Sequence, residues 1–245
     1  MNETLLLTLL ILIAALLYSS VGHGGGSGYL AAMALFGLAP DVMKPTALVL
    51  NLIVATVGTI RFARAGHFSW NIFWPFAVLS IPLAFVGGAM ELPIHVYKII
   101  LGVVLIFAAF RLAIRQSTHA PAEQKAIPFL PAMLLGSAIG LLSGLVGVGG
   151  GIFLSPILLL LGWADTRKTA GVSVVFILVN SLAGLLGHVA SVQNVPHEIA
   201  WWGPAALIGG LIGSELGSRR LAPMTMRRLL AVVLVVAGVK MLMTK

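Results

Sequence analysis

Ten apolar segments run along the chain, and most have the roughly twenty residues that a helix needs to cross about 30 Å of hydrocarbon. They lie at approximately 4–21, 28–39, 45–62, 70–90, 95–114, 128–146, 151–162, 169–190, 199–218 and 226–243. Only 9% of the 245 residues are charged, whereas a soluble domain has about 25%. Because a helix satisfies its own backbone polar groups in lipid, the segments predict an all-α polytopic membrane protein.

Two glycine clusters interrupt this pattern, 125 positions apart (22 to 147). Gly22–Gly28 reads GHGGGSG and Gly147–Gly151 reads GVGGG, and each precedes an apolar segment that is too short to cross a membrane. A glycine inside a helix costs about 1 kcal/mol relative to alanine. Irregular backbone at membrane depth persists only where protein or a water-filled cavity satisfies its polar groups. We therefore expect broken or re-entrant helices at both clusters, which form one site built twice.

The basic residues indicate the orientation of the segments, because loops rich in Lys and Arg stay in the cytoplasm. We place both termini outside and let each glycine cluster return the chain to the side from which it came. Most of the fifteen Lys and Arg residues then lie inside, namely Arg61, Arg64, Arg111, Arg115, Lys125, Arg167, Lys168, Arg219, Arg220, Arg227 and Arg228. Only Lys44, Lys98, Lys240 and Lys245 lie outside. This asymmetry predicts five membrane segments in each half.

An odd number of segments per half means that the second half is inserted upside down relative to the first. We expect a first repeat at 1–115, a cytoplasmic linker at 116–127 and an inverted second repeat at 128–245. Inverted repeats with broken helices that meet near the midplane are typical of transporters. The formal net charge is +8, but the basic residues are scattered singly or in pairs, which argues against nucleic acid as a partner. The expected partners are the lipid bilayer and a small solute.

Consecutive glycines allow the backbone to turn, and they can direct several N–H groups into one cavity at the positive end of the following helix. A pure hinge is the alternative. Close helix packing is the interpretation we favour for the glycines at four-residue spacing, which are Gly136, Gly140, Gly144, Gly209, Gly213 and Gly217. For the clusters we expect that backbone N–H groups bind a small anion. The residues that supply them are Gly24, Gly25, Gly26, Gly149, Gly150 and Gly151.

Seven polar residues lie in or near the breaks and are candidates to assist. They are His23, Ser27, Ser155, Asn51, Asn180, Thr46 and Ser173. His23 is either a proton carrier and counter-charge or a neutral hydrogen-bond partner of a freed carbonyl. The asparagines either join helices or face the substrate, and the hydroxyls either cap helices or donate to the anion. No acidic residue lies clearly inside the membrane, which favours an anion over a cation as substrate.

The second cluster and its proline, GVGGGIFLSPILLLLG with Pro156, resemble the sulfite exporter TauE/SafE family of anion permeases. The resemblance implies a multi-pass permease of the bacterial inner membrane that moves small organic or sulfur anions such as sulfite or sulfonates. The first cluster departs from the pattern, because it has Ala31 where the second has Pro156, and because it contains His23.

We therefore predict a secondary transporter that exports a small sulfur oxyanion by alternating access. The membrane potential alone supplies ~2.3 kcal/mol per 100 mV for expelling one negative charge, whereas uptake would need a coupled proton, for which His23 is the candidate. A gated anion channel and a permease for small carboxylates are the alternatives. We expect no enzyme, cofactor or metal site, because the chain has no cysteine and His23 and Ser27 have no acidic partner nearby. The sequence leaves the oligomeric state open.

Overall fold

The computed structural model describes residues 3–113, 126–188, 195–219 and 224–243. These residues form ten α-helices and no strand, and the helices coincide with the ten apolar segments, which confirms the all-α prediction. The helices are α1 (Glu3–Ser19), α2 (Gly26–Leu35), α3 (Pro40–Arg64), α4 (Trp70–Ala89), α5 (Ile94–Ala113), α6 (Phe129–Val146), α7 (Gly151–Leu160), α8 (Thr166–Gly187), α9 (Ile199–Arg219) and α10 (Met224–Met243). Most of the predicted linker 116–127 lies outside the described residues.

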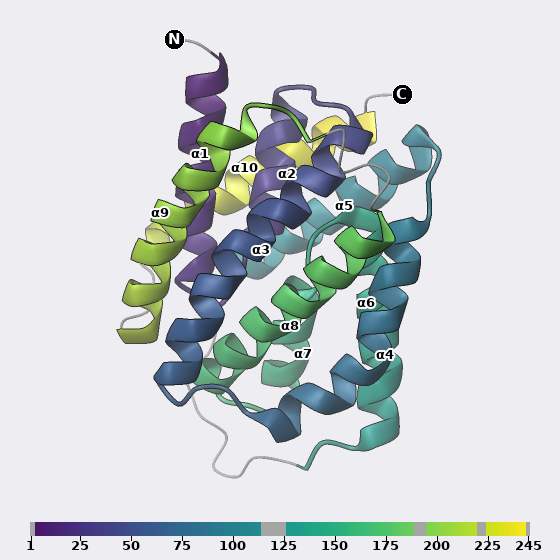
Figure 1. The fold of residues 1–245 in the computed structure, drawn as a ribbon, viewed down its shortest axis with the longest axis vertical. Coiled ribbons are helices and arrows are strands. Elements are labelled where there is room, and N and C mark those ends of the chain that lie inside the picture. Colours follow the sequence, from purple (N-terminus) through teal and green to yellow (C-terminus); the bar gives the residue numbers. More distant parts are fainter. Residues whose placement is uncertain (1–2, 114–125, 189–194, 220–223, 244–245) are drawn as a thin grey trace.

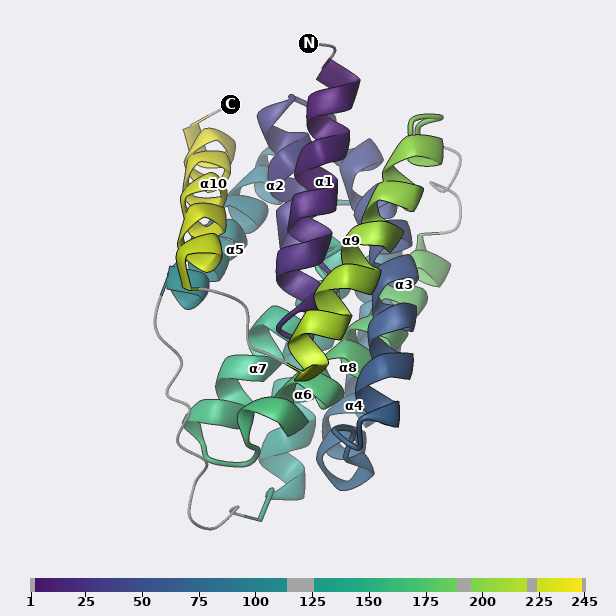
Figure 2. The ribbon, with the colours of Figure 1, turned by 90° about the vertical axis from the view of Figure 1, so that its left-hand side faces the viewer.

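Four helices, α3, α4, α6 and α8, are long and apolar enough to cross a membrane. By contrast, α2 and α7 have ten residues each, or about 15 Å at 1.5 Å per residue. Figures 1 and 2 show α1 running inward from the N-terminus and α2 running back towards the same end. We call the end at which α1 begins and α10 ends the terminal end, and the other the opposite end.

The helices of the two halves of the chain pack against each other rather than separately. Helix α4 of the first half lies along α6 and against α8 of the second half. Helix α9 of the second half lies along α1 and against α3 of the first half. The pair α3 and α8 also pack together, while α5 pairs with α10 at one side of the bundle (Figure 2). The short helix α2 packs against α1, α3 and α5 of its own half and against α10 of the other, whereas α7 packs against α6 and α8 of its own half.

Glycines at four-residue spacing explain how closely these helices approach. A Cβ atom on Gly140 of α6 would lie 2.2 Å from the carbonyl oxygen of Ser80 on α4. One on Gly213 of α9 would lie 2.1 Å from the carbonyl oxygen of Leu16 on α1. Backbone thus touches backbone along both pairs, as predicted for packing glycines.

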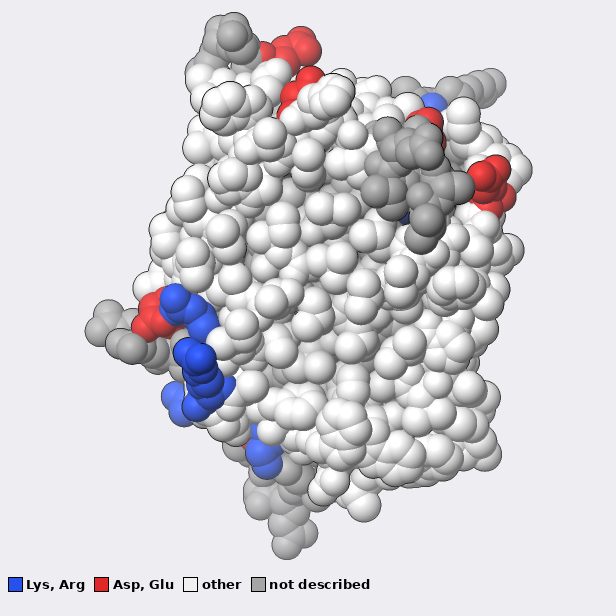
Figure 3. Space-filling model, in the orientation of Figure 1, with Lys and Arg blue, Asp and Glu red and all other residues white. Residues whose placement is uncertain are grey.

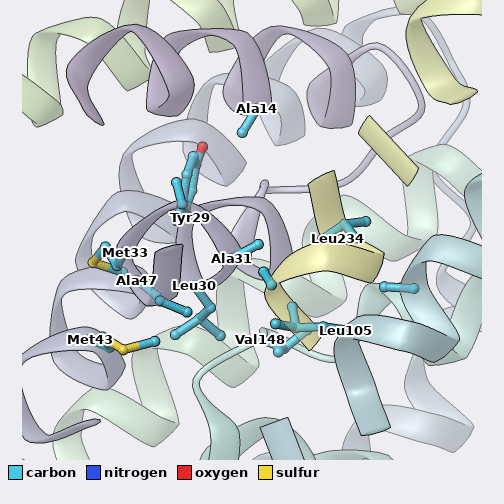
Figure 4. Packing of buried hydrophobic residues seen from close by; sticks show 14 of the residues in the cluster. Ala14, Tyr29, Leu30, Ala31, Met33, Met43, Ala47, Leu105, Val148 and Leu234 are labelled. Carbon is cyan, nitrogen blue, oxygen red and sulfur yellow. The ribbon is translucent and has the colours of Figure 1, made fainter. Parts of the chain in front are cut away.

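The short helix α2 is enclosed by its neighbours. Every residue from Gly26 to Ala34 is buried, and Figure 4 shows Tyr29 and Leu30 packed in the same cluster as Leu105 of α5 and Leu234 of α10. Its backbone ends are thereby shielded from lipid, which a half-length helix requires.

Charged side chains lie near the two ends of the bundle and leave an apolar band between them. On the face shown in Figure 3, most of the Lys and Arg atoms gather towards the opposite end, and most Asp and Glu atoms lie towards the terminal end. An ion pair joins Arg61 of α3 to Glu215 of α9. The long apolar helices and this charge distribution fit a protein that crosses a membrane several times.

Candidate functional site

The two glycine clusters turn the chain with similar backbone geometry. Gly25 precedes α2 with φ 103° and Gly150 precedes α7 with φ 81°. Only glycine adopts this left-handed region without strain. The N–H groups of Gly26 and Ser27, and those of Gly151 and Ile152, have no acceptor among the described residues. Both short helices therefore begin with unpaired donors at the positive end of the helix dipole.

The two breaks touch each other inside the bundle. A Cβ atom on Gly26 would lie 2.6 Å from the carbonyl oxygen of Val148. Gly24 and Gly149 lie against the same two side chains, Asn51 of α3 and Ile177 of α8. Segments that are 125 residues apart in the sequence thus share one site, with α3 and α8 as its walls.

The space between the breaks is small. It is lined by the first break together with Tyr18, Val148, Ile152 and Ile177. Its volume is about 10 Å³, which is roughly the space of one water molecule. An anion larger than water enters only when the two breaks move apart.

A chain of hydrogen bonds links His23 to the second half. The Nδ1 atom of His23 lies 3.1 Å from the carbonyl oxygen of Val21, so Nδ1 carries a proton and donates it. The Nε2 atom lies 3.2 Å from the hydroxyl of Ser155 on α7, which is 2.8 Å from the hydroxyl of Ser173 on α8. Three of the predicted residues are thereby joined, and the link crosses from one half of the chain to the other.

Asn51 reaches the second break from α3. Its Nδ2 donates to the carbonyl oxygen of Val148 at 3.2 Å, whereas its Oδ1 is buried and has no partner in the described part of the chain. The hydroxyl of Ser181 on α8 is likewise buried and unpartnered, and it lies 2.9 Å from where a Cβ atom on Gly149 would be. Ser181 was not among the residues predicted from the sequence; it follows the predicted Asn180 in α8, and only Ser181 lies against the second break.

The other predicted side chains bind elsewhere. Ser27 borders the cavity, but its hydroxyl donates to Tyr18 at 2.7 Å. Thr46 donates to Val42 one turn back in its own helix. Asn180 accepts from Ser80 of α4 at 2.6 Å, so it joins two helices. The structure therefore brings His23, Asn51, Ser155 and Ser173 to the breaks and leaves Thr46 and Asn180 away from them.

A larger pocket opens near the terminal end, with a volume of about 450 Å³. Its lining includes Asp41, Glu91 and the buried Lys44, which is only 4% exposed. The Nζ of Lys44 donates to the carbonyl oxygens of Gly87, Gly88 and Met90 at 3.3, 2.9 and 3.4 Å. Its backbone lies against Gly147, so Lys44 separates the pocket from the second break.

Long apolar helices that enclose two half-length helices, with their N-terminal turns meeting inside the bundle, are characteristic of membrane transporters. Residues 7–241 match the family described as Sulfite exporter TauE/SafE. The chain belongs to this family, which confirms the resemblance seen in the sequence. It is therefore a membrane transporter and not an enzyme.

Two curated relatives extend over almost the whole chain, and a third covers 80% of it. "Probable membrane transporter protein y4hK" of Sinorhizobium fredii is 41% identical over 244 residues, which cover 98% of this chain and 99% of the relative. "Probable membrane transporter protein MJ0441" of Methanocaldococcus jannaschii is 29% identical over 267 residues, covering 98% and 97%. A "Probable membrane transporter protein" of Xylella fastidiosa is 26% identical over 206 residues, covering 80% and 77%. No solved structure matches the chain significantly.

Proposed function

We propose that this transporter exports a small sulfur oxyanion, which it binds between the first turns of α2 and α7. The observation that carries the proposal is the contact between the two breaks, each of which begins its short helix with N–H groups that have no acceptor among the described residues. The first break and Ile152 of α7 line the small space beside this contact. Two helix N-termini attract negative charge, and the described site residues include no carboxylate to repel it. Glycines make the approach possible because any Cβ atom would fill the space.

The two halves are proposed to be inverted repeats. Three features support this arrangement. The positive-φ glycines Gly22 and Gly25 recur 125 positions later as Gly147 and Gly150. The packing of α4 on α6 and α8 has its counterpart in α9 on α1 and α3. Figure 1 shows α1 and α6 starting from opposite ends. An inverted pair provides two equivalent arrangements of the halves around one site, as alternating access requires.

Transport in this scheme begins with separation of the breaks, because the cavity of about 10 Å³ does not hold an oxyanion. The pocket beside Lys44 provides the approach from the terminal end, which we place outside in a bacterial inner membrane. Expelling one negative charge releases ~2.3 kcal/mol per 100 mV, so export needs no coupled ion. His23 would serve as the proton donor if the direction were reversed.

Counterflow in proteoliposomes tests this proposal. Vesicles loaded with unlabelled sulfite should accumulate labelled sulfite transiently, with a rate that saturates. Flux that neither saturates nor shows counterflow would assign a channel instead. Counterflow of small carboxylates without any of sulfite would assign a carboxylate permease.

The orientation can be tested separately, because the chain has no cysteine of its own. Single cysteines at the exposed positions Thr4 and Ala65 report the two ends of the bundle. A membrane-impermeant thiol reagent added outside intact cells should label Thr4→Cys and spare Ala65→Cys. The reverse pattern would place the terminal end in the cytoplasm.

A further inference from the structure

The amide of Asn51 has a fixed orientation. One of its terminal atoms lies 3.2 Å from the carbonyl oxygen of Val148. Because a carbonyl oxygen only accepts hydrogen bonds, the atom that faces it is the Nδ2 donor. The Oδ1 acceptor consequently points to the other side, towards Gly24, where a Cβ atom would lie 2.8 Å from it.

This Oδ1 is an unpaired acceptor beside a break whose first helical N–H groups are unpaired donors. Asn51 is 0% exposed, and its Oδ1 has no hydrogen-bond partner within the described ranges. An unpaired buried acceptor carries a penalty that a ligand with its own hydrogen relieves, whereas a bare anionic oxygen is repelled there. The negative oxygens of an anion can accept hydrogen bonds from the N–H groups of α2 and α7 and from the Ser181 hydroxyl. The Oδ1 of Asn51 instead needs a hydrogen-bond donor on the ligand.

We infer that the substrate is a monoanion that bears a hydrogen-bond donor, that is, a singly protonated oxyanion such as hydrogensulfite rather than a fully deprotonated anion or a simple sulfonate. This inference rests on the proposed function and specifies its substrate class. Asn51 selects for the protonated oxygen, and Ser181 donates to one of the charged oxygens.

The inference changes where the proton resides during transport. A protonated anion carries its own proton across the membrane, so the protein needs no titrating side chain to move one. Among the described residues, the titratable groups that border the site are His23, Tyr18 and Tyr29, and Lys44 lies behind the second break with its Nζ bonded to carbonyl oxygens at the end of α4. Tyr29 donates to the carbonyl oxygen of Gly24 and Tyr18 accepts from Ser27, so both are occupied in structural bonds.

The experiment uses the full chain in proteoliposomes at equal pH on both sides and zero membrane potential. Exchange of sulfite is compared with exchange of methanesulfonate, a monoanion of similar shape without a hydrogen on oxygen. At constant total sulfite, exchange should rise from about pH 8 to about pH 6 with the fraction of hydrogensulfite, and His23→Gln should keep this profile. Methanesulfonate should exchange at least about tenfold more slowly, because it leaves Asn51 unpaired.

Four variants separate the choice between the two anions from effects on folding. Asn51→Ala should bring the sulfite to methanesulfonate ratio close to one, and Asn51→Asp should preserve it, since a buried neutral carboxyl group keeps one acceptor and one donor. Asn180→Ala removes an equally buried amide that joins α8 to α4, so it should lower stability without moving the ratio. Ser181→Ala should slow both anions about tenfold and leave the ratio unchanged.

The outcomes distinguish the two proposals. Equal exchange of sulfite and methanesulfonate by the natural protein would overturn this inference and leave anion transport standing. A flat pH profile for sulfite would do the same, as would a profile that His23→Gln abolishes, which would assign the proton to the histidine. Exchange of no oxyanion at all would overturn both.

Discussion

The two glycine breaks turn at matching positions but differ in the side chains that hold them. Gly22 and Gly25 in the first break have positive φ, as do Gly147 and Gly150 in the second, which has a further positive φ at Gly149. In the first break, the carbonyl oxygen of Gly24 accepts from Tyr29, four residues into the helix that the break introduces. In the second, the carbonyl oxygen of Val148 accepts from Asn51, which belongs to the other half of the chain.

Side chains that join the breaks also come unequally from the two halves. The first break contributes His23, which lies within hydrogen-bond distance of Ser155 in α7, the helix that follows the second break. The second break contains no titratable residue at all. Glycines with positive φ thus recur in both breaks, whereas the side chains that join the breaks do not recur. Movement of one half relative to the other would break the contacts of Asn51 and His23 and leave that of Tyr29 intact.

The largest effect is expected from alanine at the helix starts. Gly25→Ala and Gly150→Ala should each lower anion exchange more than about a hundredfold, because a Cβ atom on a left-handed residue costs about 1–2 kcal/mol and would crowd the side chains packed against each break. Gly25→Ala should also lose more thermal stability, since its Cβ atom would lie 2.5 Å from Tyr29, against 3.0 Å from Ile139 and Phe176 for Gly150→Ala. Proteoliposome exchange and thermal unfolding in detergent measure the two effects.

Gly203→Ala is the matched control, because a Cβ atom there meets only Ile53 at an ordinary 3.5 Å. It should insert and transport like the natural protein. Normal exchange by either break variant would show that the breaks serve packing and that the site lies elsewhere.

The next effect separates the serines of the two breaks. Ser155→Ala removes the hydroxyl that connects His23 to Ser173, so sulfite exchange should fall about tenfold. Ser27→Ala removes a bond to Tyr18 within the first half, and exchange should fall only about two- to threefold. Equal losses in initial exchange rates would contradict the view that contacts between the halves matter more than contacts within one half.

A smaller effect, on stability alone, is expected from Tyr29→Phe. Loss of the hydroxyl leaves the buried carbonyl oxygen of Gly24 without its partner, which costs about 1–3 kcal/mol. Unfolding temperature should fall while the preference among anions is unchanged. A changed preference among anions would show that Tyr29 takes part in substrate binding. In that case a side chain held by the first break would affect the substrate, as Asn51 does at the second.

The smallest effect concerns His188, which follows α8 and lines the pocket beside Lys44. Burial and then the charge of Lys44 lower the pKa of His188, whereas a backbone hydrogen bond with Gly88 and the charges of Glu91 and Asp41 act in the opposite direction. The folded state therefore disfavours protonated His188, so its contribution to stability is present above about pH 6.5, the usual pKa of histidine, and declines as the pH falls below that value. His188→Gln should make unfolding temperatures less dependent on pH in this range. An unchanged pH dependence would show that His188 does not contribute to it.

Much of the fold follows from local properties of the sequence. Apolar length predicted all ten helices, and adjacent glycines marked where α1 and α6 end and two short helices begin. Strict four-residue spacing distinguished the glycines that pack helices together, such as Gly140 and Gly213, from the consecutive glycines of the breaks. These features are visible in the sequence because helix formation and helix breaking depend on neighbouring residues.

The partners of the polar side chains were not predictable in this way. Asn51 and Asn180 are both amides in long apolar helices, yet one reaches the second break and the other binds Ser80. Lys44 was interpreted as a topology signal, but it lies buried against the carbonyl end of α4. Ser181 carried no signal beyond being a serine in α8.

The sequence by itself determined that this chain is a helical membrane protein with two glycine-rich breaks, because hydrophobic length and glycine content act locally. Only the tertiary structure decided that the breaks touch, that His23 meets Ser155, and that the Asn51 oxygen is left without a hydrogen. Those contacts join residues about a hundred positions apart, and they depend on how α3, α7 and α8 are rotated about their axes. That rotation is set by the packing of every neighbouring helix together.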